Sequence, residues 1–375
     1  MKNKLLLGVT ICSMFLTTNV FAISDNKTYV HNDEYTIGSE LKNNLCNSPL
    51  GNVVFPNSIS IDNKEIELYC VYSNKNDVIN QINNQYSDVI SFVKNNYNFS
   101  EDLSDSNWNE YRNAMNNVSV DFPNISNDFL KRIAVIDAAF DIYENNEVNE
   151  EISDLANEIK SSKRMTDEKK ENLKEELDLM TPDYSDKFKQ NNGGTKVGAS
   201  LNVTLASSYA NAHAKSPNTP TYYYFSNGDC TNFMSQILEY SGVSQVVYDS
   251  VYSGWWHKKN GNTHTHSRSW TMANTFSNYM GVTVRTTSIQ NWANNLNEGD
   301  FVALDKTNDG SFDHMGYITG SNGYTMIDDE VNMVCYNIKN VKIAQHTSNY
   351  NDYISSSTNG WENYAGRGAF GRIRG

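Results

Sequence analysis

The chain has 375 residues, of which 38% are hydrophobic and 12% aromatic, and a formal net charge of −14. This length exceeds the usual size of one hydrophobic core, so about two domains are expected, and the composition excludes a chain that is disordered throughout. The negative charge argues against nucleic acid and anionic lipid surfaces as partners, because both would repel the protein.

The first residues have the pattern of a signal peptide. Lys2 and Lys4 precede a mostly apolar stretch from Leu5 to Leu16, and Val20-Phe21-Ala22 offers small residues before a cut. The apolar stretch is shorter than the roughly 20 residues of a membrane-spanning helix. We therefore predict a signal peptide over residues 1–22, a secreted or cell-wall-associated protein, and no membrane insertion after cleavage.

The charge is unevenly spread along the chain. Residues 195–375 carry 12 Lys and Arg against 13 Asp and Glu, so nearly all of the net charge belongs to the N-terminal half. The stretch from Thr181 to Ser200, with Pro182 and an Asn- and Gly-rich cluster, is the best linker candidate. We predict an N-terminal domain over residues 23–190 and a second domain over residues 195–375.

The predicted elements differ between these regions. Short apolar runs around Gly51 to Phe55 and Ile66 to Tyr72 favour strands, and the pattern from Asp77 to Met180 is mostly helical. Beyond Leu201, β-branched and aromatic residues predict strands over 300–305, 314–319, 324–327 and 342–346, with one helix that starts near Asp229. The expected class is α+β.

Four cysteines remain once Cys12 leaves with the signal peptide. Cys46 and Cys70 lie in the same region and could form one bridge in an oxidising compartment, although spacing alone does not settle connectivity. Cys230 and Cys335 are then left to explain.

Cys230 has the setting of a nucleophile. It follows the turn-forming Ser226-Asn227-Gly228 and precedes a helix-compatible stretch, which places it in the first turn of a helix. Free N–H groups and the helix dipole stabilise a thiolate there, and the cysteine's own amide could help to hold an oxyanion. The alternative is a buried structural cysteine, the commoner fate of an isolated one.

A thiol nucleophile needs a base, and His314 is the best candidate. It follows a predicted strand and a polar turn, and it opens the next predicted strand. Imidazole has the pKa both to take the thiol proton and to return it to a leaving amine. The N-terminal half contains no comparable constellation.

These motifs resemble the "Putative amidase domain" family, related to the NlpC and CHAP cell-wall peptidases, which are papain-like. The resemblance covers roughly residues 203–350 and rests on several ordered motifs: Tyr209-Ala210, Asp229-Cys230-Thr231-Asn232-Phe233-Met234-Ser235-Gln236, Ser269-Trp270, Gly299-Asp300, Asp313-His314 and Gln345-His346-Thr347. It implies a helix carrying Cys230 packed on an antiparallel sheet carrying His314. It also implies hydrolysis of amide bonds, with peptidoglycan or peptides as substrate.

Such sites usually add a third polar residue that orients the imidazole. We predict His346 for this role, because the relatives place a histidine, asparagine or glutamate at the end of that strand. Gln345, which would point to the opposite face, and Asn349 remain alternatives.

Aromatic residues near the nucleophile are candidates for substrate binding. Trp255 and Trp256 lie between nucleophile and base, and adjacent residues of a strand point to opposite faces, so only one of the pair is expected to be buried. Tyr224, or its neighbour Tyr223, is a candidate second oxyanion donor. Packing roles are the alternative for all of them, and Asn232 and Gln236 are expected to brace the site.

Two segments are candidate metal sites. His257, His264 and His266 could bind zinc, but a flexible Asn- and Gly-rich loop separates them. The stretch from Asp305 to Asp313 has oxygen-bearing residues where a calcium loop would, but Gly316 replaces the bidentate glutamate. We predict no metal and no cofactor. The rival hypotheses to a cysteine amidase are a non-catalytic wall-binding protein and a zinc amidase.

Overall fold

A computed structural model describes residues 48, 50–161, 165–182, 201–356 and 358–375. All of them belong to one compact unit. The predicted signal peptide, Cys46 and the predicted domain boundary at 190–195 lie outside these residues, so those predictions stay open; Cys70 itself is disulfide-bonded. In the described ranges, no helix is both long enough and apolar enough to cross a membrane.

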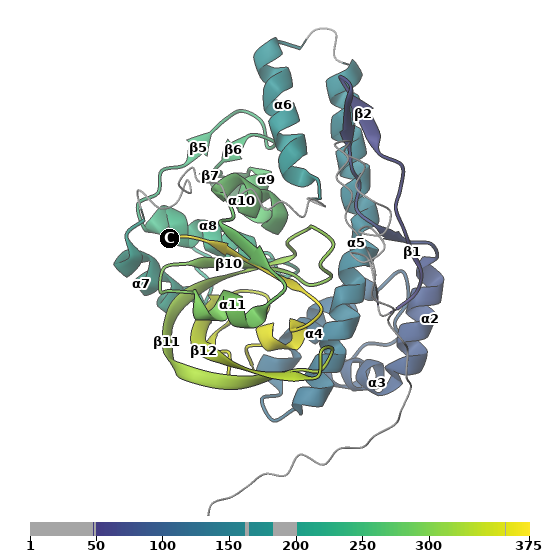
Figure 1. Cartoon of the computed structure of the whole chain (residues 1–375). Helices are drawn as coiled ribbons and strands as arrows, with labels where there is room; N and C mark the ends of the chain where they lie inside the picture. The colour runs from purple at the N-terminus through teal and green to yellow at the C-terminus, as the bar shows by residue number, and fades with distance from the viewer. Residues whose placement is uncertain (1–47, 49, 162–164, 183–200, 357) are drawn as a thin grey trace, which may run out of the picture. The chain divides into compact units, whose positions relative to one another are not determined.

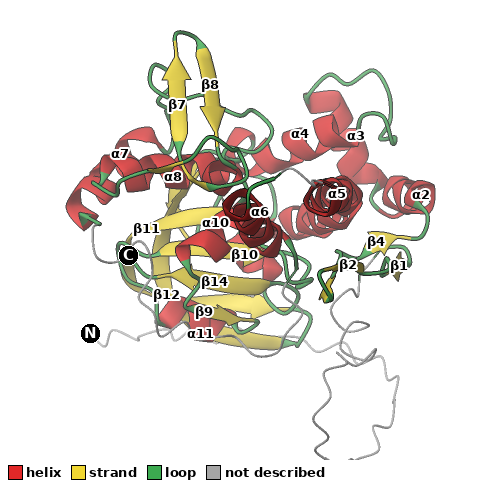
Figure 2. Cartoon of the chain, turned by 90° about the horizontal axis from the view of Figure 1, so that it is seen from above, coloured by secondary structure: helices red, strands yellow, loops and turns green. Residues whose placement is uncertain are grey.

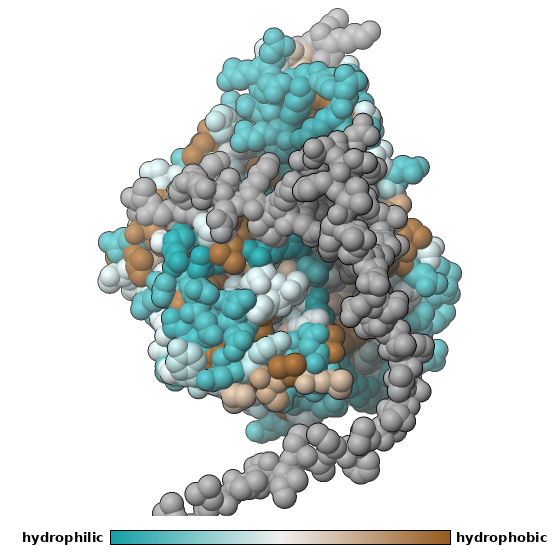
Figure 3. All heavy atoms as spheres, in the orientation of Figure 1, coloured by the Kyte–Doolittle hydropathy of each residue, from teal (hydrophilic) through white to brown (hydrophobic). Residues whose placement is uncertain are grey.

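The N-terminal part combines short strands with helices that include one very long one. The elements are β1 (Val53–Val54), β2 (Ile59–Ile61), β3 (Lys64–Ile66), β4 (Val71–Tyr72), α2 (Lys75–Gln85), α3 (Ser87–Asn96), α4 (Trp108–Asp121), α5 (Asn127–Ser161) and α6 (Asp167–Met180). Thr166 caps α6 by accepting the N–H of Lys169, and Asn74 caps α2 in the same way. Figure 3 shows hydrophilic side chains gathered over α6, in keeping with its highly charged sequence.

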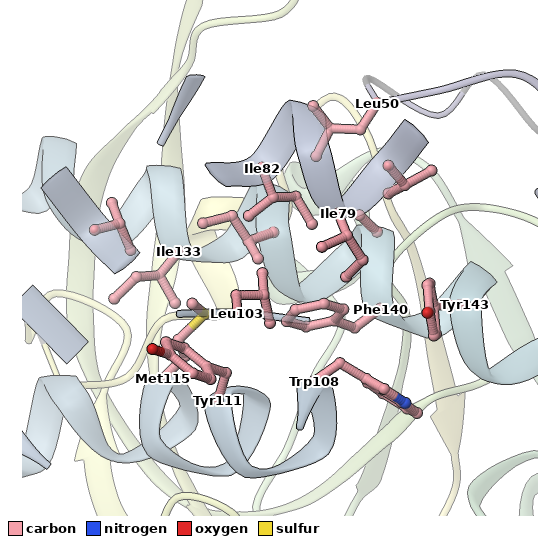
Figure 4. Close-up of a cluster of buried hydrophobic side chains, with 14 of the residues drawn as sticks. Leu50, Ile79, Ile82, Leu103, Trp108, Tyr111, Met115, Ile133, Phe140 and Tyr143 are labelled. Atoms are coloured by element: carbon pink, nitrogen blue, oxygen red, sulfur yellow. The ribbon is translucent and has the colours of Figure 1, made fainter. Parts of the chain in front are cut away.

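Helix α5 belongs to more than one hydrophobic core. Ile133, Ile136 and Phe140 pack with α2, α3 and α4, where buried side chains converge (Figure 4). Ala134 and Ala138 instead join the core beneath the C-terminal sheet. Small residues on that side allow the helix to approach the sheet closely. The N-terminal helices and the C-terminal sheet therefore share apolar packing.

The C-terminal part is built around a six-stranded sheet, in the order β13-β12-β11-β10-β14-β9. Every neighbouring pair is antiparallel. Its strands are β9 (Val284–Thr286), β10 (Phe301–Asp305), β11 (His314–Asp329), β12 (Val334–Gln345), β13 (Tyr350–Tyr353) and β14 (Ala369–Ile373). The separate strands predicted over 314–319 and 324–327 are one strand, because β11 continues through two irregularities in its pairing with β12.

Helices cover both faces of this sheet (Figure 1). They are α7 (Val203–His213), α8 (Cys230–Tyr240), α9 (Arg268–Thr271), α10 (Ala273–Met280), α11 (Ile289–Asn294) and the 3-10 helix η1 (Trp361–Tyr364). Phe301, Met315 and Tyr317 share a core with α7, α8 and α10. The alternate residues Val302, Leu304 and Ile318 share a core with α11, η1 and α5. The mixed α and β class predicted from the sequence is confirmed.

Two small hairpins complete the described chain. β5 (Val246–Val247) pairs with β6 (Gly254–Trp255), and β7 (His257–Asn260) pairs with β8 (Thr263–His266). Figure 2 shows β7 and β8 projecting away from the six-stranded sheet. These hairpins lie between α8 and α9 in the sequence, although the two helices pack against each other in the fold.

Candidate active site

The N-terminus of α8 is held by the carboxylate of Asp229, its N-cap residue. Oδ1 accepts the backbone N–H of Phe225 at 2.9 Å and the amide of Asn232 at 2.7 Å. The backbone N–H of Asp229 donates to Thr347 Oγ1 at 2.9 Å. These bonds tie the start of the helix to the preceding turn and to the segment after β12. Cys230 is the first residue of α8, as the sequence predicted.

Burial dominates the electrostatics of Cys230. The thiol is free and the residue is only 8% exposed. Burial raises the pKa of Cys230 above the ordinary thiol value, and hydrogen bonds with Thr231 and the Met315 backbone oppose this shift, together with the charge of Lys306. The expectation of a lowered pKa at a helix terminus therefore does not hold here, because the loss of hydration outweighs the effect of the helix end.

His314 opens β11, where it pairs with Leu304 of β10. Its Nε2 atom is buried and has no hydrogen-bond partner within the described ranges. Burial, together with the charge of Lys306, lowers the pKa of His314 to about 4, although the side chain of Gln345 opposes the shift. The imidazole is thus neutral at ordinary pH, with an available ring nitrogen.

The structure brings Cys230 and His314 to one pocket of about 460 Å³. No hydrogen bond joins their side chains in the described part of the chain. Residues from both ends of the sequence line this pocket, and Arg112 and Asp137 come from α4 and α5. The N-terminal helices thus form part of its wall, which the sequence did not indicate.

His346, the predicted third residue, is engaged elsewhere. Its Nδ1 lies 2.5 Å from Oδ2 of Asp229, its Nε2 lies 2.9 Å from the carbonyl oxygen of His213, and its ring stacks on Phe233. The structure therefore does not bring it to His314. Its partners indicate that it helps to fix Asp229, the N-cap of α8.

Gln345 is the residue that reaches His314. Tyr317 pairs with Ala344, so strand alternation places Gln345 on the face of His314 and His346 on the opposite face. Trp361 Nε1 donates to Gln345 Oε1 at 2.7 Å, which fixes the amide. Asn349, the other alternative, bonds to Tyr224 and to the backbone of Thr347 instead.

The predicted substrate-binding aromatic residues do not line the pocket. Trp255 and Trp256 are 1% and 4% exposed, so the expectation that one of them faces solvent is wrong. Trp255 stacks on Trp270 and donates to Ser235, whereas Trp256 donates to the Ser253 carbonyl oxygen. Trp255 ends β6 and Trp256 lies between β6 and β7, so the two residues do not alternate along one strand. Tyr224 bonds to Asn349.

The side chains of the two candidate metal segments have other contacts. His257 Nε2 lies 2.9 Å from His264 Nδ1 across the β7–β8 hairpin. Asp305 pairs with Arg285 and accepts backbone N–H groups of its own turn. Among the described residues, no group of three or more His, Cys, Asp or Glu side chains could hold a metal ion.

Sequence reasoning missed Lys306 and the charges of α4 and α5. Lys306 Nζ lies 2.7 Å from Asp137 Oδ2. A signal was available, because Asp137 and Asp141 stand one turn apart inside the apolar stretch from Ile133 to Ile142. Buried carboxylates require cationic or hydrogen-bonding partners.

Residues 200–368 match the family model described as "Putative amidase domain". This match indicates amidase-type hydrolysis; the relation to the NlpC and CHAP peptidases stays a prediction. The Bacillus subtilis (strain 168) protein described as "Uncharacterized protein YhbB" is 34% identical over 98 residues, which make up 25% of this chain and only 30% of that protein. No solved structure matches the chain at a significant level.

Proposed function

We propose that this protein is an exported cysteine amidase or peptidase that hydrolyses amide bonds in peptides, with the peptides of peptidoglycan as substrate. One observation carries the proposal: Cys230 and His314, whose Nε2 atom has no hydrogen-bond partner among the described residues, line one pocket, and both lie within the region that matches an amidase model. A nucleophile and a base with access to a common space are what acyl transfer requires.

In the proposed reaction, Cys230 Sγ attacks the substrate carbonyl carbon while its proton passes to His314 Nε2. The C–N bond then breaks, and His314 returns the proton to the leaving amine, which leaves a thioester on the sulfur. A water molecule gives a proton to His314 and attacks the thioester, and the acid leaves as the proton returns to sulfur. The proton that departs with the amine is replaced by one from water, so Cys230 and His314 end the cycle in their starting protonation states.

The raised pKa of Cys230 and the lowered pKa of His314 determine how the first step runs. Both groups are neutral near pH 7, so the proton moves as the sulfur attacks, and no standing thiolate and imidazolium pair is needed. Gln345, rather than His346, orients the imidazole in this proposal, because it contacts the ring and is itself fixed by Trp361.

Removal of the sulfur tests the proposal. Purified full-length protein and a Cys230→Ala variant are incubated with peptidoglycan, and the released fragments are analysed by mass spectrometry. New amine and carboxyl termini should appear with the parent protein and be lost in the variant. Cys335→Ala is the matched control and should retain activity, because Cys335 lies outside the pocket and bonds to Asp328.

Two outcomes would count against a cysteine enzyme. Fragments released equally by Cys230→Ala would refute the nucleophile, and loss of activity with a chelator alone would favour the zinc alternative. The export proposal is tested separately, by sequencing the N-terminus of protein from the culture medium, which should begin at Ile23.

A further inference from the structure

A charged cluster links the N-terminal helices to the candidate active site. Lys306, in the turn after β10, places Nζ 2.7 Å from Asp137 Oδ2 and 3.5 Å from Asp141 Oδ2. Its side chain is 8% exposed, and the residue lines the same pocket as Cys230 and His314. Asp137 and Asp141 both belong to α5. This ion pair therefore connects the two halves of the chain at the pocket wall.

The carboxylate of Asp137 is firmly held. Its Oδ1 accepts Arg112 Nε at 3.1 Å, and its Oδ2 accepts the hydroxyl of Tyr364 at 2.8 Å as well as the ammonium of Lys306. Arg112 also pairs with Asp141 and Glu144. Charges buried to this extent persist only when each has partners, and a network of this kind fixes the position of every member.

Lys306 is also fixed at its backbone. Its N–H donates to Asp313 Oδ2 at 2.8 Å, and Asp313 immediately precedes His314. The N–H of Asp313 in turn donates to the carbonyl oxygen of Leu304 at 2.8 Å. The turn that presents Lys306 to the pocket is thus the turn that delivers His314 to β11. The ammonium group and the imidazole are positioned by one piece of backbone.

We propose that Lys306, held by Asp137 and Asp141, supplies the standing positive charge beside Cys230 and His314, and that α5 is therefore a working part of the active site. The inference rests on the proposed cysteine chemistry. Lys306 would stabilise negative charge on the sulfur and on the oxyanion formed after attack. Asp137 would act as a positioning residue, through Lys306.

The electrostatic effect of Lys306 on the two reacting groups supports this role. Its charge lowers the pKa of Cys230 and also lowers the pKa of His314. It thus favours the thiolate and disfavours the imidazolium. In an enzyme that relies on a thiolate and imidazolium pair, protonated histidine is the counter-charge of sulfur. Here Lys306 would supply that counter-charge as negative charge develops on the sulfur during attack, and His314 is left neutral and able to accept a proton.

The test measures the reactivity of Cys230 without any substrate. Alkylation of Cys230 in full-length protein by iodoacetamide is followed by peptide mass spectrometry between pH 5 and 10. Lys306→Met should slow alkylation at pH 7 by about tenfold and move its pH midpoint upward by about one unit, as expected for loss of a nearby opposite charge. Lys306→Arg keeps the charge and should stay within about threefold of the parent.

The matched control is Lys131→Met. Lys131 lies on α5 and, like Lys306, forms an ion pair between the two parts of the chain, here with Glu330, but it does not line the pocket. Its loss should leave the alkylation profile unchanged. A second readout is the pH dependence of kcat/KM, measured from the rate at which peptides are released from peptidoglycan. Without Lys306 the acid limb should move to higher pH, because the pKa of His314 is no longer depressed by that charge.

The double variant Lys306→Met/Asp137→Asn removes one positive and one negative charge, so the net charge of the cluster is preserved. It tests the role of Lys306 if the single variant Lys306→Met does not fold. It too should slow the alkylation of Cys230, by less than the single variant. A folded variant without Lys306 that alkylates at the parent rate, with unmoved pH limbs, overturns the inference and marks the cluster as purely structural. Persistent hydrolysis by Cys230→Ala would instead refute the proposed function, so the two failures are distinguishable.

Discussion

Glu176 offers a direct test of how burial governs the charges in this protein. The residue lies on α6, which packs against α10, and it is only 2% exposed. Its Oε1 has no hydrogen-bond partner in the part of the chain that the structure describes. Burial raises the pKa of Glu176 from 4.5 to about 8, although Arg268 opposes the shift. The side chain is therefore protonated in the folded protein at neutral pH.

The sign of the linkage follows from these two values. The pKa of Glu176 is higher in the folded protein than in the unfolded chain. Below pH 4.5 both states bind the proton, so this group does not change the free energy of unfolding with pH there. Above that, the unfolded state gains by ionising, at about 1.4 kcal/mol for each pH unit up to the folded value. The free energy of unfolding attributable to Glu176 thus falls by about 3 kcal/mol between pH 4.5 and pH 7.

Glu176→Gln removes this dependence, because the amide is similar in shape and does not ionise. Urea unfolding followed by tryptophan fluorescence should give similar free energies for variant and parent at pH 4.5, and a variant more stable by about 3 kcal/mol at pH 7. Glu175→Gln is the matched control on the same helix. Glu175 is exposed, so its replacement should change stability by less than about 0.5 kcal/mol.

The test compares how steeply the free energy of unfolding falls with pH in the parent and in Glu176→Gln. If the parent and Glu176→Gln lose stability in parallel between pH 4.5 and pH 7, Glu176 is ionised or hydrated in the folded protein. The argument that burial controls its charge would then be refuted, and α6 would have to separate from α10 more readily than the contacts in the structure indicate.

Two further predictions concern the surroundings of His314. Gln345→Leu removes the interaction that raises the pKa of His314, so the acid limb of kcat/KM should move to lower pH. The value of kcat/KM should also fall on the order of tenfold to hundredfold, because the imidazole loses its orientation. An unmoved acid limb would exclude Gln345 as the orienting residue. Gly316→Ala places a Cβ atom 2.6 Å from Ile343 Cγ2 and should cost about 1–3 kcal/mol in urea unfolding. A Cβ atom added at Gly228 meets no heavy atom of the described residues within 4 Å, so equal losses in Gly228→Ala would contradict this account.

Local features of the site were accessible from the sequence. The turn before Cys230 and the helix pattern after it place the thiol at the start of α8, because both signals lie within a few residues of the cysteine. The polar turn between two apolar runs likewise places His314 at the start of a strand. A mixed α and β class followed from the same local patterns, with boundaries close to those observed for β10.

The choice between His346 and Gln345 depended on information that is not local. Alternation along a strand shows that the two residues point to opposite faces, but only the register between β11 and β12 shows which face holds His314. The prediction that one residue of the Trp255–Trp256 pair is exposed was wrong for a related reason. Alternation applies only within a strand, and β6 ends at Trp255, so the burial of both residues depends on the fold and not on a local pattern.

The contribution of α5 to the pocket wall could not be predicted from the sequence. Asp137 and Asp141 within an apolar run indicate that cations must lie nearby, but many lysines and arginines could serve. Only the fold selects Lys306, and that selection makes the N-terminal half relevant to the pocket. A detachable accessory domain would not be expected to contribute Ala134 and Ala138 to the core beneath the sheet. The shared core and the ion pair show that the wall of the candidate pocket is built from both halves of the chain.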